Sequence, residues 1–263
     1  MALGKDNRTP TCPFRKDSAP CSKSGGVCSI RTYEQVGAGY LGKPTSQPVI
    51  VCPIRFEEQD LLVRWLAEIA GFPPTEAQVA REVPFMVGTT TRRPAGKIDL
   101  VVAKTADGGI VWHGLEIQAV YFSGKGMESE FTALENTGEI GLPFPDALRR
   151  PDWRSSSAKR LMPQLQIKAP TLRRWGSKIA VAVDSEFFNA IGGPSLNPSH
   201  DLNDGDVIWL IPRLEEQAGR HRLSRGHWEV LTLEDSTAKL LAASTIRKDA
   251  FEQMLRTKLH PLT

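Results

Sequence analysis

The stretch GKIDLVVAKTADGGIVWHGLEIQAVYF, residues 96–122, constrains the fold of this chain more than any other segment. Its two apolar runs, 97–103 and 111–121, flank the turn sequence Asp107, Gly108 and Gly109. Apolar runs of this length predict strands, and a glycine-rich turn between two of them predicts a hairpin. We therefore expect an antiparallel β-hairpin in this segment.

Three polar side chains, Asp99, Glu116 and Gln118, stand in this hairpin at positions where its alternation should have made the residues apolar. Asp99 and Glu116 can converge at one sheet edge, and Glu116 and Gln118 share a face because strand side chains repeat every two residues. Two close carboxylates repel each other unless a cation lies between them, and Mg²⁺ commonly binds one or two carboxylates. Such a metal can activate a water and neutralise charge on a phosphate under attack. The alternative is a solvent-facing hairpin with no catalytic role.

The rest of the pattern indicates a mixed α/β core. Residues 56–71 carry apolar side chains at helical spacing and end on a glycine, which predicts a helix. Further strands are expected at 82–87, 178–183, 206–212 and 228–233, and helical segments at 238–259 and 156–175, the latter interrupted by Pro163 and Pro170. This order predicts an α/β fold with a mixed sheet of the α+β kind. We expect a loop-rich region at 1–55 and the main domain at 56–263.

All four cysteines, Cys12, Cys21, Cys28 and Cys52, lie in the loop-rich region. The chain has no apolar secretion signal and no run of about 18 apolar residues, so we expect no membrane span and a cytoplasmic location. Disulfides rarely persist in a reducing compartment. A tetrahedral site of four thiolates, suited to Zn or to a single Fe, is therefore favoured over two disulfides. Isolated buried cysteines are the other alternative, because the common C-x2-C spacing is absent.

Basic residues are concentrated in residues 149–178, although the net charge of the whole chain is only +3. In this segment the nine lysines and arginines are opposed only by Asp152. Such a block suits a polyanionic partner, and an ordinary solvated helix face is the alternative.

Five short motifs occur in a fixed order along the chain: TPTCPF at 9–14, GGVC ending at Cys28, VCPIR beginning at Val51, GLEIQ at 114–118 and KRLMPQ at 159–164. In this order they resemble the NotI-type restriction endonucleases, which belong to the PD-(D/E)XK nuclease superfamily. The resemblance extends over residues 9–188. It implies a type II restriction endonuclease that makes double-strand cuts, with a PD-(D/E)XK core and an N-terminal loop module in which four cysteines bind a metal.

The resemblance also assigns the site residues. Asp99, Glu116 and Gln118 match the catalytic residues, with Asp99 and Glu116 as Mg²⁺ ligands and a glutamine where the superfamily usually has a lysine. Glu82 is the candidate for a further carboxylate near the metal. Cys12, Cys21, Cys28 and Cys52 match the ligands of a structural iron, so the resemblance favours Fe where the spacing alone left Zn open.

The expected partner is double-stranded DNA with a GC-rich palindromic site, cut by a homodimer, with a companion methyltransferase protecting host DNA. Arginine suits guanine in the major groove, and lysine suits phosphates. The candidate DNA contacts are Arg149, Arg150, Arg154, Lys159, Arg160 and Lys168. Two alternatives stay open: a metal-stabilised DNA-binding module without nuclease activity, and a structure-specific repair nuclease.

Overall fold

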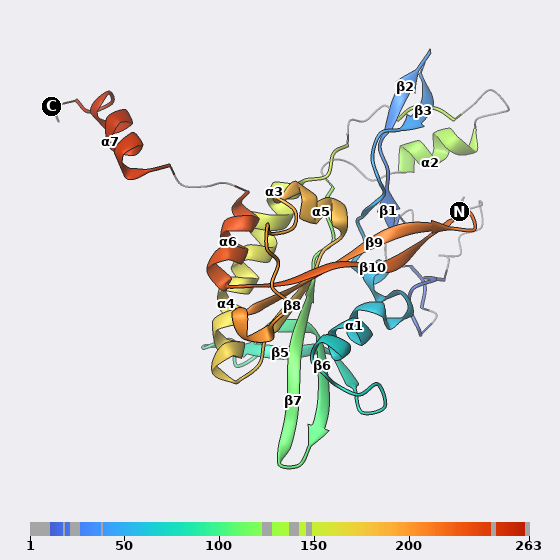
Figure 1. Ribbon diagram of the computed structural model, residues 1–263. Helices are drawn as coiled ribbons and strands as arrows, with labels where there is room; N and C mark the ends of the chain where they lie inside the picture. Colours follow the sequence, from blue (N-terminus) through green and yellow to red (C-terminus); the bar gives the residue numbers. More distant parts are fainter. Residues whose placement is uncertain are drawn as a thin grey trace.

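A six-stranded mixed sheet forms the centre of the protein in the computed structural model, which describes residues 11–17, 19–21, 27–37, 39–122, 128–136, 142–145, 149–242 and 246–260 (Figure 1). The strand order is β10-β9-β8-β7-β6-β5. These strands are β5 (Gln78–Val87), β6 (Pro94–Ala106), β7 (Gly109–Ile117), β8 (Ile179–Ala182), β9 (Val207–Gln217) and β10 (Arg220–Leu231). Neighbours pair antiparallel from β5 to β7 and from β9 to β10, whereas β7, β8 and β9 run parallel. The expected mixed α/β fold is confirmed.

Helices cover both faces of this sheet. The main helices are α1 (Leu61–Ile69), α2 (Glu128–Glu135), α3 (Trp153–Ser156), α4 (Met162–Arg174), α5 (Ser185–Ala190), α6 (Leu233–Leu241) and α7 (Lys248–Arg256). One buried cluster joins α1 to the sheet through Leu62, Trp65 and Leu115, and a second joins α4, α5 and α6 to the opposite face. Neighbouring residues of β8 alternate between the two clusters, as expected for a strand that is buried on both faces.

The predicted hairpin is confirmed as β6 and β7, with Ala106 paired to Gly109 at the turn. Gly108 adopts a φ of 98°, a conformation that glycine reaches without strain. Gly114 in β7 lies under α4, where a Cβ atom would come within 2.9 Å of Ile179 and 3.1 Å of Leu172. The glycine therefore lets α4 pack closely on the strand that carries Glu116.

The segment expected to be an interrupted helix is one helical run from α3 through α4. Its irregularity is a π-helical turn at Ser157–Leu161, directly before α4. Proline lacks an amide N–H, so Pro163 cannot make the regular helical bond back to residue 159, which is consistent with a wider turn here. Pro170 lies inside α4 without ending it.

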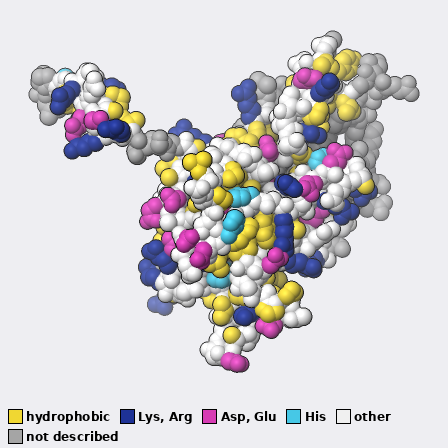
Figure 2. Space-filling model, viewed as in Figure 1, with side chains coloured by type: hydrophobic (Ala, Val, Ile, Leu, Met, Phe, Trp, Pro, Cys, Tyr) yellow, Lys and Arg dark blue, Asp and Glu magenta, His cyan; other side chains and the backbone are white. Residues whose placement is uncertain are grey.

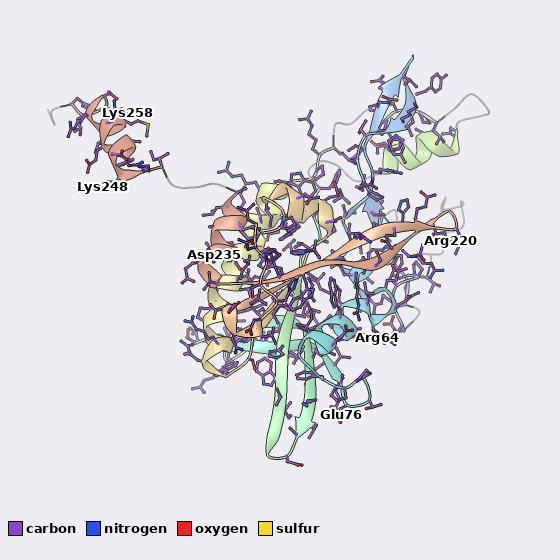
Figure 3. The ribbon with its side chains drawn as sticks, viewed as in Figure 1. Arg64, Glu76, Arg220, Asp235, Lys248 and Lys258 are labelled. Carbon is purple, nitrogen blue, oxygen red and sulfur yellow. The ribbon has the colours of Figure 1, made fainter. Side chains whose placement is uncertain are left out.

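Two other helix expectations differ from the structure. The helix expected at 56–71 begins only at α1, because the preceding 3₁₀ turns of Pro53–Asp60 contain Gln59 and Asp60 at positive φ. The helical stretch expected at 238–259 consists of α6 and α7, because Ala242 adopts a left-handed conformation that ends α6. In Figure 3, the labelled Lys248 and Lys258 mark α7, which lies apart from the sheet.

Short strands organise the N-terminal region: β1 (Ser29–Ile30), β2 (Tyr33–Val36), β3 (Tyr40–Pro44) and β4 (Val49–Ile50). β1 pairs with β4 and β2 pairs with β3, both antiparallel. Val49 and Ile50 are buried in the two clusters of the main core. The backbone N–H of Ile50 donates to Asp184 at 2.6 Å, and its carbonyl accepts from Val120 at 3.0 Å. The division at residue 55 stays a prediction, and β4 packs as part of the main core.

Within the described residues, none of the helices is both long enough and apolar enough to span a membrane.

Candidate active site

Asp99 and Glu116 lie where β6 and β7 separate. The ladder between these strands runs from Ala106 and Gly109 to Leu100 and Leu115, and the next pair in this register would be Asp99 and Glu116. At that position the side chains take over the contacts: the N–H of Ile117 donates to Asp99 Oδ2 at 2.9 Å, and the N–H of Asp99 donates to Glu116 Oε1 at 3.4 Å. The two carboxylates are therefore neighbours at the open end of the hairpin, as the sequence predicts.

Both carboxyl groups bind protons more tightly than usual. Burial, followed by the charge of the neighbouring Asp99, raises the pKa of Glu116 to about 7, against the lowering effect of Lys168. Burial also raises the pKa of Asp99, although the hydrogen bond from Ile117 and the charge of Lys168 act in the opposite direction. A pair of carboxylates that is costly to ionise together is a typical feature of a site that binds a cation or exchanges protons.

Lys168 reaches this pair from α4. Its Nζ lies 2.6 Å from Glu116 Oε1 and donates to Gln164 Oε1 at 2.9 Å, one helical turn earlier. The side chains of Lys168 and Glu116 are only 7% and 2% exposed. Lys168 was predicted as a DNA contact. The structure places its side chain beside Glu116, buried between α4 and the β6–β7 hairpin. The sequence signal was the i, i+4 spacing of Gln164 and Lys168, which puts both on one helix face.

Gln118 follows the last residue of β7. Its amide Nε2 donates to the carbonyl of Ala119 at 2.6 Å, so this donor is engaged with the neighbouring backbone. Gln118 has no charge at any pH, and it can orient a water or a phosphate oxygen only through hydrogen bonds. It lies at the same end of the sheet as Glu116, because its own N–H donates to Ala182 at the end of β8.

Glu82 stands across from Asp99 on β5. Arg81 pairs with Leu100 and Val83 pairs with Ile98, which leaves Glu82 opposite Asp99 in the ladder. At Glu82 the strand is bent, with a φ of 51°. Its carboxylate pairs with Lys97 at 3.0 Å on the surface, and its charge contributes to the raised pKa of Asp99.

The four cysteines gather in two pairs. An isolated bridge between Thr11 and Pro20 brings Cys12 and Cys21 together, and the pairing of β1 with β4 brings Cys28 beside Cys52. The N–H of Cys52 donates to the carbonyl of Cys28 at 3.2 Å. Burial raises the pKa of Cys28, and the Cys52, Cys12 and Cys21 thiols also raise it, so these three cysteines lie within electrostatic reach of Cys28. No disulfide joins these four residues, all of which belong to the described ranges.

The gathered cysteines do not form a closed metal site. Across the described ranges, no group of three or more His, Cys, Asp or Glu side chains is arranged to hold a metal ion. The donor chemistry nevertheless fits a thiophilic metal, because four thiolates suit Zn or Fe. The iron assignment therefore stays a proposal.

The predicted DNA contacts other than Lys168 occupy different environments. Arg150, Arg154, Lys159 and Arg160 are exposed, and Arg160 lies over the ring of Tyr121 at 4.4 Å. Arg149 is buried in an ion pair with Glu130 of α2. The helix that carries the exposed residues is tied to the chain that follows Gln118, because the N–H of Tyr121 donates to Ser156 Oγ and the N–H of Asp152 donates to the carbonyl of Tyr121, both at 2.8 Å.

Comparison with known proteins identifies the family. The family model described as Restriction endonuclease NotI matches residues 2–224 of the 263-residue chain. The chain belongs to the NotI restriction endonuclease family. It is therefore a restriction endonuclease, a hydrolase that acts on double-stranded DNA. The comparison with curated proteins gives no match. The resemblance found in the sequence motifs is confirmed, and the Asp99–Glu116 pair lies inside the region that the NotI family model matches.

Proposed function

We propose that this NotI-family protein is a type II, Mg²⁺-dependent endonuclease that hydrolyses both strands of DNA at a GC-rich palindromic site. The observation that carries the proposal is the Asp99–Glu116 pair, half-buried to buried, at the point where β6 and β7 separate. The order α1, β5, β6, β7, α4, β8 supports a PD-(D/E)XK core, with both carboxylates on the central hairpin.

The two carboxylates fit Mg²⁺, because this ion takes one or two carboxylates and completes its shell with water and phosphate oxygens. Asp99 and Glu116 would hold it, and when bound it supplies charge neutralisation at the phosphate and lowers the pKa of water. Gln118 accepts or donates hydrogen bonds that orient the water or phosphate. The raised pKa of Glu116 means that ion binding displaces a proton near neutral pH.

The exposed basic residues of the α3–α4 run and of the segment directly before it supply the DNA-binding surface. Three exposed arginines, Arg150, Arg154 and Arg160, are the candidates for guanine contacts, because an arginine fork matches the O6 and N7 acceptors in the major groove. Lys159, which is also exposed, suits phosphates. Arg149 contributes by fixing α2 through Glu130. The hydrogen bonds around Tyr121 support this placement, because they join the basic helix to the catalytic strand.

A palindromic site read by one protein matches two-fold symmetry, so the active form is proposed to be a homodimer with one active site in each copy. The four cysteines hold a structural iron, with Zn as the alternative metal, and need no redox role. A companion methyltransferase is expected, because a restriction endonuclease would otherwise cut host DNA. The cytoplasm is the expected compartment, since the DNA substrate is there.

The test is to incubate purified protein with unmethylated GC-rich plasmid and phage DNA in Mg²⁺ and to sequence the fragment ends. Asp99→Ala serves as the inactive variant, and Asp107→Ala at the exposed hairpin turn serves as the matched control. Discrete fragments that share one palindromic end, absent only with Asp99→Ala, support the proposal. A smear would indicate a structure-specific nuclease, and uncut DNA that shifts on a gel would indicate a DNA-binding module. Either result contradicts the proposed function.

A further inference from the structure

Hydrolysis of a phosphodiester builds negative charge on the phosphate oxygens, and a fixed cation beside them stabilises the transition state. Gln118, which lies two residues after Glu116 and directly follows β7, is neutral and cannot supply that charge. Lys97 is close to the site, but its ammonium group is half-exposed and paired with Glu82 on the surface. Lys168, by contrast, is buried and contacts Glu116 of the carboxylate pair directly, at 2.6 Å.

Lys168 comes from a different element than the carboxylates. It lies in α4 between Leu165 and Leu172, both buried in the core cluster that fixes this helix against β7 and β8. Its position is therefore set by the packing of a whole helix. Gly114 contributes to this placement, because the missing side chain allows Leu172 to approach β7.

The ammonium group of Lys168 is held in a defined orientation. An ammonium group has three donors. One points to Glu116 Oε1 and one to Gln164 Oε1, so a third is available for an oxygen of a bound phosphate. Glu116 is a candidate ligand of Mg²⁺, so a phosphate that shared this ion would come close to the lysine that contacts Glu116.

A purely structural role explains this lysine poorly. Burying an ion pair costs desolvation energy, and an apolar residue of similar size is often neutral or stabilising at such a position. Leu165, Ala169 and Leu172 already fill the contact between α4 and the sheet. A buried lysine that contacts Glu116 and acts electrostatically on Asp99 is instead typical of a functional site.

We propose that Lys168 is a catalytic residue that contacts the scissile phosphate and supplies the positive charge that Gln118 lacks. Gln164 is the positioning residue that holds its Nζ. Lys168 forms no covalent bond and transfers no proton in this role. The inference rests on the proposed nuclease function, and it changes the expected role of Lys168 from a phosphate contact that holds the DNA to one that acts on the phosphate being cut.

If this is correct, a positive charge placed at Gln118, directly after β7, should replace the charge of Lys168 on α4. Lys168→Met removes the cation and keeps an apolar chain of similar length. Gln118→Lys in the same protein returns a cation from the end of β7. The matched control is Lys239→Met, because Lys239 also pairs with a buried glutamate, Glu229, but lies on α6 away from the β6–β7 carboxylates.

The experiment measures the single-turnover cleavage rate at saturating DNA and Mg²⁺, and separately the Kd for DNA without Mg²⁺. We expect Lys168→Met to lower the rate by at least about 100-fold, in the range seen when one electrostatic donor is removed. DNA affinity should stay within about threefold, because the lysine is buried and contributes little to encounter. Adding Gln118→Lys should restore the rate by about tenfold or more. Lys239→Met should cleave within about threefold of the wild type.

Gln164→Leu tests the same idea without removing the lysine, and so remains informative if Lys168→Met fails to fold. It should lower the cleavage rate by about tenfold with unchanged DNA affinity, because the ammonium group loses its second anchor. Wild-type cleavage together with full activity in Lys168→Met, or in Gln164→Leu, would overturn this inference alone. Absence of rescue by Gln118→Lys would also count against it. A wild-type protein that cuts no DNA would overturn the proposed function, and this inference with it.

Discussion

Two groups of candidate metal ligands lie in this protein, and they are held in different ways. Asp99 and Glu116 follow directly on a ladder of seven residue pairs between two long strands. The cysteines rely on one isolated bridge and on the two-residue strands β1 and β4. A long ladder fixes the residues at its end without a bound ligand, whereas a single bridge and a two-residue ladder do not. The carboxylates are thus positioned by the fold, and the cysteine site is expected to be completed by the metal that it binds.

The largest effect is expected when one carboxylate of the Asp99–Glu116 pair is neutralised. Glu116→Gln should lower the cleavage rate by about a thousandfold, because a metal ligand in the transition state is worth about 4 kcal/mol. The fold should persist, since the ladder remains. Single-turnover cleavage and thermal unfolding measure the two effects. Glu76→Gln, an exposed residue labelled in Figure 3, is the control. A variant that cuts normally would show that Glu116 has no catalytic role.

The pH dependence of stability sharpens the same comparison. Burial raises the pKa of Glu116 from 4.5 to about 7, so the folded protein holds this proton more tightly than the unfolded chain. In metal-free protein, Glu116 should therefore cost about 3 kcal/mol of stability as the pH rises through this window. Denaturant unfolding in EDTA at pH 5 and pH 8 measures the loss. The slope should be smaller in Glu116→Gln, and an unchanged slope would contradict the assignment.

The cysteine pairs should respond to the loss of one ligand by loosening the N-terminal region. Cys12→Ser leaves an incomplete site, and a loss of about 2 kcal/mol would lower Tm by about 4–8 °C. Metal content by elemental analysis should fall at the same time. Ser18→Ala, three residues before Cys21 in the sequence, is the control. Equal metal content in the wild type and Cys12→Ser would show that the cysteines do not act as one site.

The smallest effect is expected at Glu82, where two variants distinguish the effect of backbone strain on stability from the effect of the carboxylate charge on cleavage. A non-glycine residue at a φ of 51° is strained, so Glu82→Gly should raise Tm by about 2–4 °C, whereas Glu82→Ala should not. If the carboxylate assists the neighbouring Asp99, both variants should lower the cleavage rate by about tenfold. Melting curves and cleavage rates of the two variants test this. Full cleavage by both would remove Glu82 from the site.

The comparison also explains which features could be predicted from the sequence. The two apolar runs and the turn at 107–109 were enough to predict the hairpin, because strand pattern and turn chemistry are local. Asp99 and Glu116 were noticed because they interrupt the apolar pattern, and the family resemblance assigned them to a site. Lys168 was assigned to a DNA-binding surface, because it belongs to the basic block at 149–178. Its i, i+4 spacing with Gln164 also allowed a helix face turned toward the active site, and the spacing alone does not distinguish that face from surface. Whether a basic residue faces solvent or the core depends on how α4 packs against β7, and that contact joins residues about fifty positions apart. The end of α6 at Ala242 likewise carries no glycine signal.

The bonds of β4 set how the protein should unfold. Ile50 donates to Asp184, and Asp184 also accepts from Phe187 at the start of α5, while Val120 closes the other side of Ile50. One buried carboxylate thus ties the cysteine-bearing end of the chain to the strand and helix that follow the active site. We therefore expect β4 and the start of α5 to unfold together. Hydrogen exchange at the amides of Ile50 and Val120 should require global opening, and the two should exchange at similar rates. On the face shown in Figure 2, the lysine and arginine side chains are scattered among acidic, apolar and uncharged ones.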